Sequence, residues 1–339
     1  MRPIFRPHLV NDPFGDAGLY IDFMFERRAV MFDLGDVAAL GTRKLLRLER
    51  VFITHAHMDH FAGFDLLLRV GLGRAKRIAL YGPPGFADRV GHKLHGYTWN
   101  LLDRYAENLV FDVIEAGTVG STAACRFQSR NAFRREDVPI EGVAGEILCD
   151  GGTYRVRYAT LDHATPCLAF AIEENSHVNI MKNALKSMGL PVGPWLRALK
   201  AAVLRGEPDD KPFRAWWTED GNAREAWLPL GRIKREALQI VPGQKIAYVV
   251  DAAFTPANAR AIEALAQDSD ILFIETPFLD ADVAIAATRN HLTARQAGLL
   301  GRRAGAKRIV PFHFSPRYAD RAADLSAEAL DAFTGADRA

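Results

Sequence analysis

The feature that most constrains this chain is a cluster of metal-binding side chains directly after a hydrophobic segment. Residues 50–54, Arg-Val-Phe-Ile-Thr, are expected to form a buried strand. The six residues that follow contain His55, His57, Asp59 and His60. Three imidazoles and a carboxylate this close together are too costly to bury without a cation. The cluster therefore predicts a metal site at the end of a strand, with ligands that suit zinc and other divalent ions.

Strand and helix patterns alternate along the rest of the chain. We expect strands at 154–161, 167–173, 245–250, 271–274 and 308–310, and helices at 61–70, 258–267 and 293–303. His163, Asp251 and His313 each follow one of these strands, where sheet folds gather functional side chains. A lone histidine in such a place is usually an ordinary hydrogen-bonded residue. Singly, these three positions are therefore weak candidates for metal ligands.

One segment, residues 181–245, interrupts the alternation. With 339 residues, 49% of them hydrophobic, the chain is expected to form a single domain, 1–339, that carries this segment as a helical or loop insertion. The insertion holds twelve basic and seven acidic residues and four of the five tryptophans. Its cations could neutralise phosphates while its tryptophans stack on bases. The candidate nucleic-acid contacts are Lys182, Lys186, Arg197, Lys200, Arg232, Lys234 and Arg235. The same composition also suits a lid or a subunit interface.

Composition narrows the setting of the protein. A net charge of +2 does not mark the whole chain as a nucleic-acid binder. The three cysteines, Cys125, Cys149 and Cys167, are too few and too scattered for a disulfide framework, which favours a reducing compartment. We find no signal-peptide pattern and no apolar run of about 18 residues, the length of a membrane span. The expectation is a soluble, cytoplasmic protein without a membrane partner.

The histidine cluster resembles a known signature. Thr-His-Ala-His-Met-Asp-His, residues 54–60, is similar to the metal-binding motif of the metallo-β-lactamase fold, and Asp33 looks like that family's early strand-end aspartate. The resemblance implies a four-layer αββα sandwich. It also implies two divalent ions, zinc first, with manganese or iron as alternatives. The implied ligands are His55, His57 and His163 for one ion, Asp59, His60 and His313 for the other, and Asp251 between the two.

The last third of the chain is similar to one branch of this family, ribonuclease Z, which processes the 3′ ends of tRNA precursors. The similarity lies in residues 274–276, 291–297 and 313–318, and in 184–194. It implies that His291 meets the charge on the leaving oxygen, that Glu275 orients His291, and that the protein is a homodimer. Asp59 is expected to orient the attacking water as well as to bind metal. His291 also precedes a capping-box pattern, Thr293 with Gln296, so it should stand at a helix start instead of on a buried face.

Some positions depart from the branch. Residues 6–15 lack its Gly-rich opening, Asp251 lies in Val-Asp-Ala instead of Gly-Asp-Thr, and Leu292 replaces a serine. The leading hypothesis is a phosphodiesterase that acts on a tRNA precursor or another phosphodiester. The alternative is a hydrolase of a small ester, cyclic nucleotide or lactone under a closed lid. A non-catalytic homologue is the least favoured, because no ligand position carries an inert residue.

Overall fold

The structure, a computed structural model, describes residues 4–24, 26–117, 121–139, 145–175, 177–219 and 221–336. The chain divides into two compact units. Unit 1 consists of residues 1–173 and 244–339, and unit 2 of residues 174–243. No helix in the described ranges is long and apolar enough to cross a membrane. Because the two units are separate bodies, each is described by itself.

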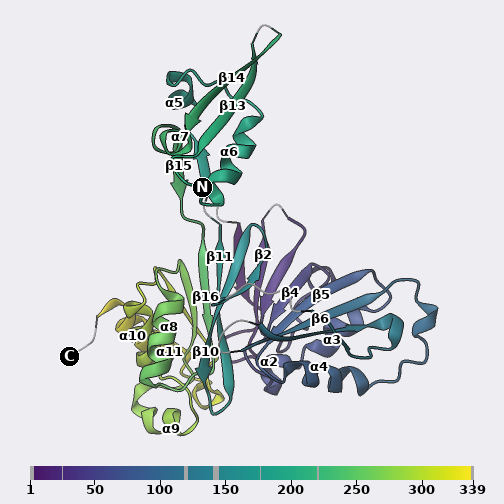
Figure 1. The fold of residues 1–339 in the computed structure, drawn as a ribbon. Coiled ribbons are helices and arrows are strands. Elements are labelled where there is room, and N and C mark those ends of the chain that lie inside the picture. Colours follow the sequence, from purple (N-terminus) through teal and green to yellow (C-terminus); the bar gives the residue numbers. More distant parts are fainter. Residues whose placement is uncertain are drawn as a thin grey trace. The chain divides into compact units, whose positions relative to one another are not determined.

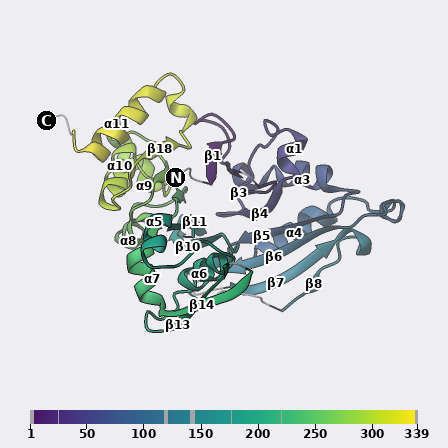
Figure 2. The same ribbon diagram turned by 90° about the horizontal axis from the view of Figure 1, so that it is seen from above.

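Unit 1 begins with an eight-stranded sheet in the order β1 to β8 (Figure 2). Strands β3 to β6 run parallel to one another, and the remaining pairs are antiparallel. The strands are β1 Phe5–Leu9, β2 Leu19–Phe23, β3 Ala29–Phe32, β4 Leu48–Phe52, β5 Lys76–Gly82, β6 Leu109–Ala116, β7 Ser121–Gln128 and β8 Glu136–Asp137. On β6, Leu109, Phe111 and Val113 alternate with less buried residues, as expected of a strand with one face against a core.

The second sheet has six strands in the order β18-β17-β16-β11-β10-β9. Its strands are β9 Ile147–Asp150, β10 Tyr154–Asp162, β11 Pro166–Glu174, β16 Lys245–Val249, β17 Ile271–Glu275 and β18 Ile309–Phe312. Strands β16, β17 and β18 are parallel, so their C-terminal ends meet at one edge. The strands predicted around residues 154–161, 167–173, 245–250, 271–274 and 308–310 are all present.

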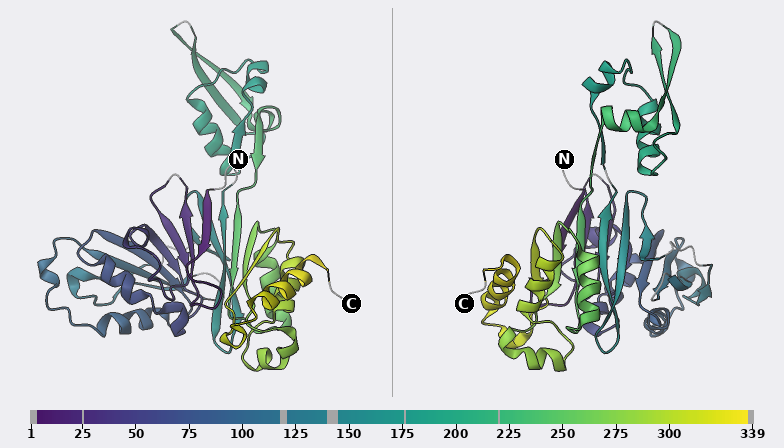
Figure 3. Two further views of the ribbon diagram at one scale, coloured as in Figure 1. Left: turned by 180° about the vertical axis from the view of Figure 1, so that it is seen from behind. Right: turned by 60° about the vertical axis from the view of Figure 1, so that its left-hand side comes forward.

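Helices cover the outer face of each sheet (Figure 1). The first sheet is covered by α1 Thr42–Leu45, α2 Met58–Phe61, α3 Phe64–Gly71 and α4 Phe86–His95, and the second by α8 Pro256–Ala266, α9 Val283–Thr288, α10 Ala294–Arg303 and α11 Ala322–Thr334. In both views of Figure 3 the yellow-green C-terminal helices lie on one side of their sheet. Between the sheets, Phe32 stacks on Phe170 with ring centroids 5.3 Å apart. This is the predicted four-layer αββα sandwich.

Local sequence explains two details of these helices. The capping box predicted for α10 is present, with Thr293 accepting from the backbone of Gln296 and the Gln296 side chain returning to Thr293. The helix predicted at 61–70 starts earlier and is interrupted at Gly63. A Cβ at Gly63 would lie 2.2 Å from the carbonyl oxygen of Gly35, so only glycine allows the chain to pass there. This close approach packs the loop after β3 against the segment that carries His55, His57, Asp59 and His60.

Unit 2 is a small α/β body with its own core. Strand β12 His177–Ile180 pairs with β15 Leu238–Val241, and β13 Pro212–Glu219 forms a hairpin with β14 Asn222–Pro229. Its helices are α5 Lys182–Ser187, α6 Trp195–Leu204 and α7 Leu230–Ala237. Trp195 is fully buried and Trp216 and Trp217 pack against the same core, whereas Trp227 is 60% exposed. The tryptophans of the segment therefore serve mainly the core, because strands that the helix-or-loop prediction did not include give them a surface to pack on.

Candidate metal centre

The ends of five strands deliver the predicted metal ligands and Glu275 to one edge of unit 1, and His291 reaches it from the loop between α9 and α10. His55 and His57 follow β4, and Asp59 and His60 lie in α2 directly after them. His163 follows β10, Asp251 follows β16, Glu275 ends β17 and His313 follows β18. The parallel register of β16, β17 and β18 is what aligns the last three. The structure therefore brings together residues that are up to 258 positions apart, between His55 and His313.

Ligand atoms of these residues form three overlapping groups, each with its atoms within 4.8 Å of one another. The groups are His55, His57, His163 and Asp251; Asp59, His60 and His313; and Asp251, Glu275, His291 and His313. Asp251 lies at the centre. Its Oδ2 is 3.2 Å from His55 Nε2 and 3.3 Å from His60 Nε2. Its Oδ1 is 3.3 Å from His313 Nδ1.

Three buried atoms at this centre face oppositely charged groups at 3.3 Å but make no hydrogen bond of normal geometry among the described residues. They are His60 Nε2, Asp251 Oδ1 and His313 Nδ1. Buried polar atoms almost always find a partner, and an uncompensated one costs free energy. A cation placed among them would satisfy all three. The side chains present therefore fit a metal centre.

The electrostatics of the centre also favour cations. Burial alone would favour neutral groups, yet the facing His313 and His60 hold the pKa of Asp251 well below its ordinary value. For His313, burial is likewise outweighed, and Asp251 raises its pKa to about 10. The carboxylates thus hold protons on the neighbouring imidazoles when nothing else neutralises them. Divalent ions compete for the same nitrogen atoms.

A network behind the ligands fixes their orientation. Asp33, which follows β3, accepts hydrogen bonds from the Thr54 backbone at 2.7 Å, from His60 Nδ1 at 2.9 Å and from the Tyr248 hydroxyl at 3.0 Å. The bond to Nδ1 leaves His60 Nε2 facing the centre. His163 is held in the same way by the carbonyl of Asn290, 2.9 Å from its Nδ1. Tyr248 and the Asn290 carbonyl were missed by sequence reasoning, because a strand-interior tyrosine and a backbone oxygen carry no motif.

Backbone conformation contributes to this arrangement. Asp33, Asp251 and His313 have φ values of 54°, 54° and 58°. Residues other than glycine rarely adopt this left-handed region, and such strain persists only where the surrounding contacts enforce it. Asp33 and His313 come directly after strands of the sandwich, and Asp251 comes two residues after one. The fold thus maintains costly conformations at the points where the side chains must turn into the site.

His291 and Glu275 form a hydrogen-bonded pair beside the centre. His291 Nδ1 donates to Glu275 Oε2 at 2.9 Å, while Glu275 Oε1 accepts from the backbone of Ala252 and Leu292. Burial opposes the charged form of Glu275, but His291 lowers its pKa to about 2. Burial lowers the pKa of His291, but Glu275 outweighs it and raises that pKa overall. The ring is therefore oriented with Nε2 away from Glu275, and His291 lines a cavity of about 310 Å³ together with His313 and Asp59.

The seven predicted nucleic-acid contacts all lie in unit 2 and fall into two sets. Arg232, Lys234 and Arg235 on α7 are paired with Glu236 or Asp209. Lys182 and Lys186 on α5, with Arg197 and Lys200 on α6, are exposed and form no ion pair within the described part of the chain. Only the second set presents free positive charge. We call these four residues the free cations of unit 2.

No family model matches the chain. Among curated proteins, the ribonuclease Z of Deinococcus radiodurans is 30% identical over 273 residues, which cover 80% of this chain and 76% of that protein. The ribonuclease Z of Halorubrum lacusprofundi is 30% identical over 314 residues, covering 90% and 83%. A metallo-β-lactamase fold protein from Bacillus subtilis superposes with a TM-score of 0.54 at 14% identity, covering 97% of this chain and 94% of that one, which supports the fold alone. Sequence identity, coverage and architecture together show that the chain belongs to the ribonuclease Z family of metallo-β-lactamase fold hydrolases.

Proposed function

We propose that this protein is an endoribonuclease that uses two zinc ions to cleave a phosphodiester bond near the 3′ end of tRNA precursors. The observation that carries the proposal is the position of Asp251, whose two oxygens face histidines of both ligand sets. Family membership supplies the substrate class, because the curated relatives are named ribonuclease Z. The sandwich fold alone would not identify the substrate class, because one fold can host many chemistries.

The ligand set suits a pair of divalent ions. His55, His57 and His163 would hold one, Asp59, His60 and His313 the other, and Asp251 would contact both. Five imidazoles favour zinc, although manganese and iron accept the same donors. When bound, such a pair supplies a water of lowered pKa and offsets charge on the phosphoryl oxygens.

Asp59 and His291 would then orient the attacking water and donate a proton to the leaving group. The Asp59 carboxylate is 45% exposed, so it can accept a hydrogen bond from the attacking water. After that water has lost one proton to solvent, its oxygen would form a bond to phosphorus while the bond from phosphorus to the leaving ribose oxygen breaks. His291, kept protonated by Glu275, would give its Nε2 proton to that leaving oxygen.

RNA contact is assigned to the free cations of unit 2. Lys182 and Lys186 are four residues apart on α5, and Arg197 and Lys200 are three apart on α6, so each pair shares a helix face. Exposed cations without acid partners can neutralise phosphates. Arg232, Lys234 and Arg235 contribute less, because their charges are already offset.

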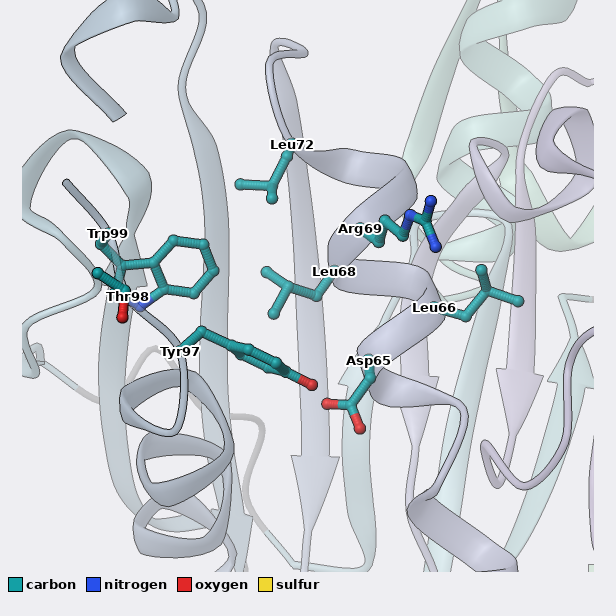
Figure 4. Close-up of a pocket in the computed structure, with 8 residues that line it drawn as sticks. All are labelled: Asp65, Leu66, Leu68, Arg69, Leu72, Tyr97, Thr98 and Trp99. Carbon is teal, nitrogen blue, oxygen red and sulfur yellow. The ribbon is translucent and has the colours of Figure 1, made fainter. Parts of the chain in front are cut away.

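Two further expectations remain proposals. A homodimer is supported by exposed apolar residues, Tyr97, Leu101 and Tyr105, at 48%, 47% and 47% exposure. Tyr97 also lines an apolar recess of about 570 Å³ with Leu72 and Trp99 (Figure 4). We expect sedimentation to give a dimer for the wild type and a monomer for Leu101→Asp, and a monomeric wild type would contradict this.

A reducing cytoplasmic location is supported by the three cysteines, all free and buried.

The test is cleavage of a tRNA precursor labelled at its 3′ trailer, beside hydrolysis of bis-p-nitrophenyl phosphate. The wild type should cleave both, and His57→Ala should lose both together with bound metal. Binding of the precursor should weaken steeply with salt, whereas turnover of a small ester should change little. Hydrolysis of small esters with an intact precursor would favour the small-molecule alternative, for which the cavity of about 310 Å³ is large enough.

A further inference from the structure

The cavity beside His291 has a second wall that neither the metal centre nor unit 2 explains. Three segments form it: residues 14–16 in the loop between β1 and β2, residues 277–278 after β17, and residues 314–316 after β18. Arg289 completes it. The first segment, which supplies Phe14, begins where the sequence departs from the ribonuclease Z pattern at residues 6–15.

The wall is fixed in place by backbone contacts to the metal motifs. Phe314 N donates to the carbonyl of Pro13 at 2.7 Å, and Ala17 N donates to the carbonyl of Asp59 at 3.2 Å. Asp12 holds the turn itself by accepting from Phe14 N at 2.8 Å. The loop is therefore tied to the proposed ligand Asp59 and to the neighbour of the proposed ligand His313, and it offers a preformed surface.

An aromatic ring forms part of this surface. The rings of Phe14 and Phe314 meet edge to face, with centroids 5.3 Å apart and planes at 85°. Phe314 is buried, whereas Phe14 is only partly buried and contacts the cavity. Phe314 thus packs against Phe14 within the same wall. A ring held in this way can stack on a nucleobase without a further ordering cost.

A cation without an ion pair lines the same cavity as this ring. Arg289 is exposed and forms no ion pair with any acid in the described ranges. The acids near it are engaged, since Asp16 accepts from the backbone of Asp36, and Asp59 faces His60 and His313. The turn that carries Arg289 is pinned by the bond between His163 and the Asn290 carbonyl. A guanidinium on a fixed turn matches the geometry of a phosphate.

We infer that this wall is a nucleotide subsite, in which Phe14 stacks on the base of the nucleotide adjoining the cleaved bond and Arg289 binds that nucleotide's phosphate. The inference rests on the proposed function, because it assigns the same site an RNA nucleotide. A cavity of about 310 Å³ accommodates a single nucleotide and not a duplex. The subsite would thus require an unpaired nucleotide at the point of cleavage.

Equilibrium binding of AMP and of inorganic phosphate to the zinc-loaded protein tests the assignment. Phe14→Leu should weaken AMP roughly tenfold and leave phosphate unchanged, while Phe14→Tyr, which keeps the ring, should bind AMP as the wild type does. Arg289→Gln should weaken both ligands roughly tenfold. Arg260→Gln, an exposed arginine on α8 outside the cavity, is the matched control.

Kinetics on the same variants separate the subsite from the proposed function. Phe14→Leu and Arg289→Gln should raise KM for RNA while zinc content stays at its wild-type value, and Arg260→Gln should leave both unchanged. Unchanged AMP binding and RNA KM in both variants would overturn the subsite and leave the endoribonuclease standing. A wild type that hydrolyses the small ester but no RNA would overturn the proposed function, and the subsite with it.

Discussion

The metal centre of unit 1 and the charged surface of unit 2 use charge in opposite ways. Asp33, Asp251 and Glu275 are at most 2% exposed, and each faces at least one histidine. The seven candidate cations of unit 2 are exposed except for the partly buried Lys234, and their partners are exposed acids or none within the described residues. A buried charge is costly unless its geometry is fixed, whereas an exposed pair contributes little. Substitutions should therefore have large chemical effects in unit 1 and small, salt-dependent ones in unit 2.

Loss of Asp251 should give the largest effect. Asp251→Ala removes the carboxylate between the two ligand sets, so we expect turnover of bis-p-nitrophenyl phosphate to fall by more than about a hundredfold, beyond what loss of an outer-sphere partner costs. Metal content should fall with it. Asp320→Asn, at an exposed position, should leave both values unchanged. Turnover within tenfold of the wild type would remove Asp251 from the proposed centre.

Removal of metal should give the next largest effect, a loss of stability of the folded protein. A ligand that binds only the folded state stabilises it by about 4 kcal/mol when its free concentration is a thousand times Kd. Chelation should therefore lower the unfolding temperature, and added zinc should restore it. Thermal unfolding followed by circular dichroism would measure this. An unfolding temperature indifferent to chelator would contradict a metal centre in unit 1.

Glu275→Gln should change the pH dependence of catalysis. Glu275 outweighs burial and raises the pKa of His291, so the protonated ring persists to higher pH in the wild type. Without the carboxylate that pKa falls, and the proton is lost at lower pH. The alkaline limb of the kcat/KM profile should therefore move to lower pH, with activity reduced roughly ten- to a hundredfold. His291→Ala should abolish that limb, and an unmoved limb in the glutamine variant would contradict the pairing.

The smallest effects are expected in unit 2. Replacing all four free cations, Lys182, Lys186, Arg197 and Lys200, by glutamine should reduce the salt slope of RNA binding by about 0.7 to 0.9 per cation. Turnover of the small ester should stay at its wild-type value. Replacing Arg232, Lys234 and Arg235 in the same way is the matched control, because their charges are already paired. Equal slopes for the two variants would undo the distinction between free and paired cations.

The comparison also separates what sequence could and could not predict. His55, His57, Asp59 and His60 lie within six consecutive residues, so a metal site could be predicted from them directly. The roles of His163, Asp251 and His313 as ligands followed from the family resemblance. The sandwich was predicted through the same resemblance. Phe14 and Arg289 could not be predicted from sequence. They line one cavity only because the folded sheet brings their two loops together.

Unit 2 shows the opposite difficulty. Its tryptophans were interpreted as base-stacking candidates from composition, yet Trp195 lies in the core. Composition cannot distinguish a buried aromatic ring from an exposed one when the strand pattern that buries it is weak. The charges had the same ambiguity, since the acids that pair with Arg232 and Lys234 are seen only in the structure.

The most direct test of the central claim is calorimetric titration of metal-free protein with zinc, performed on the wild type and on His57→Ala. The account predicts about two zinc ions per wild-type chain, weaker binding of at least one of them in the variant, and turnover of bis-p-nitrophenyl phosphate that rises with occupancy. Wild-type protein that binds no zinc, or a metal-free variant with full turnover, would contradict it.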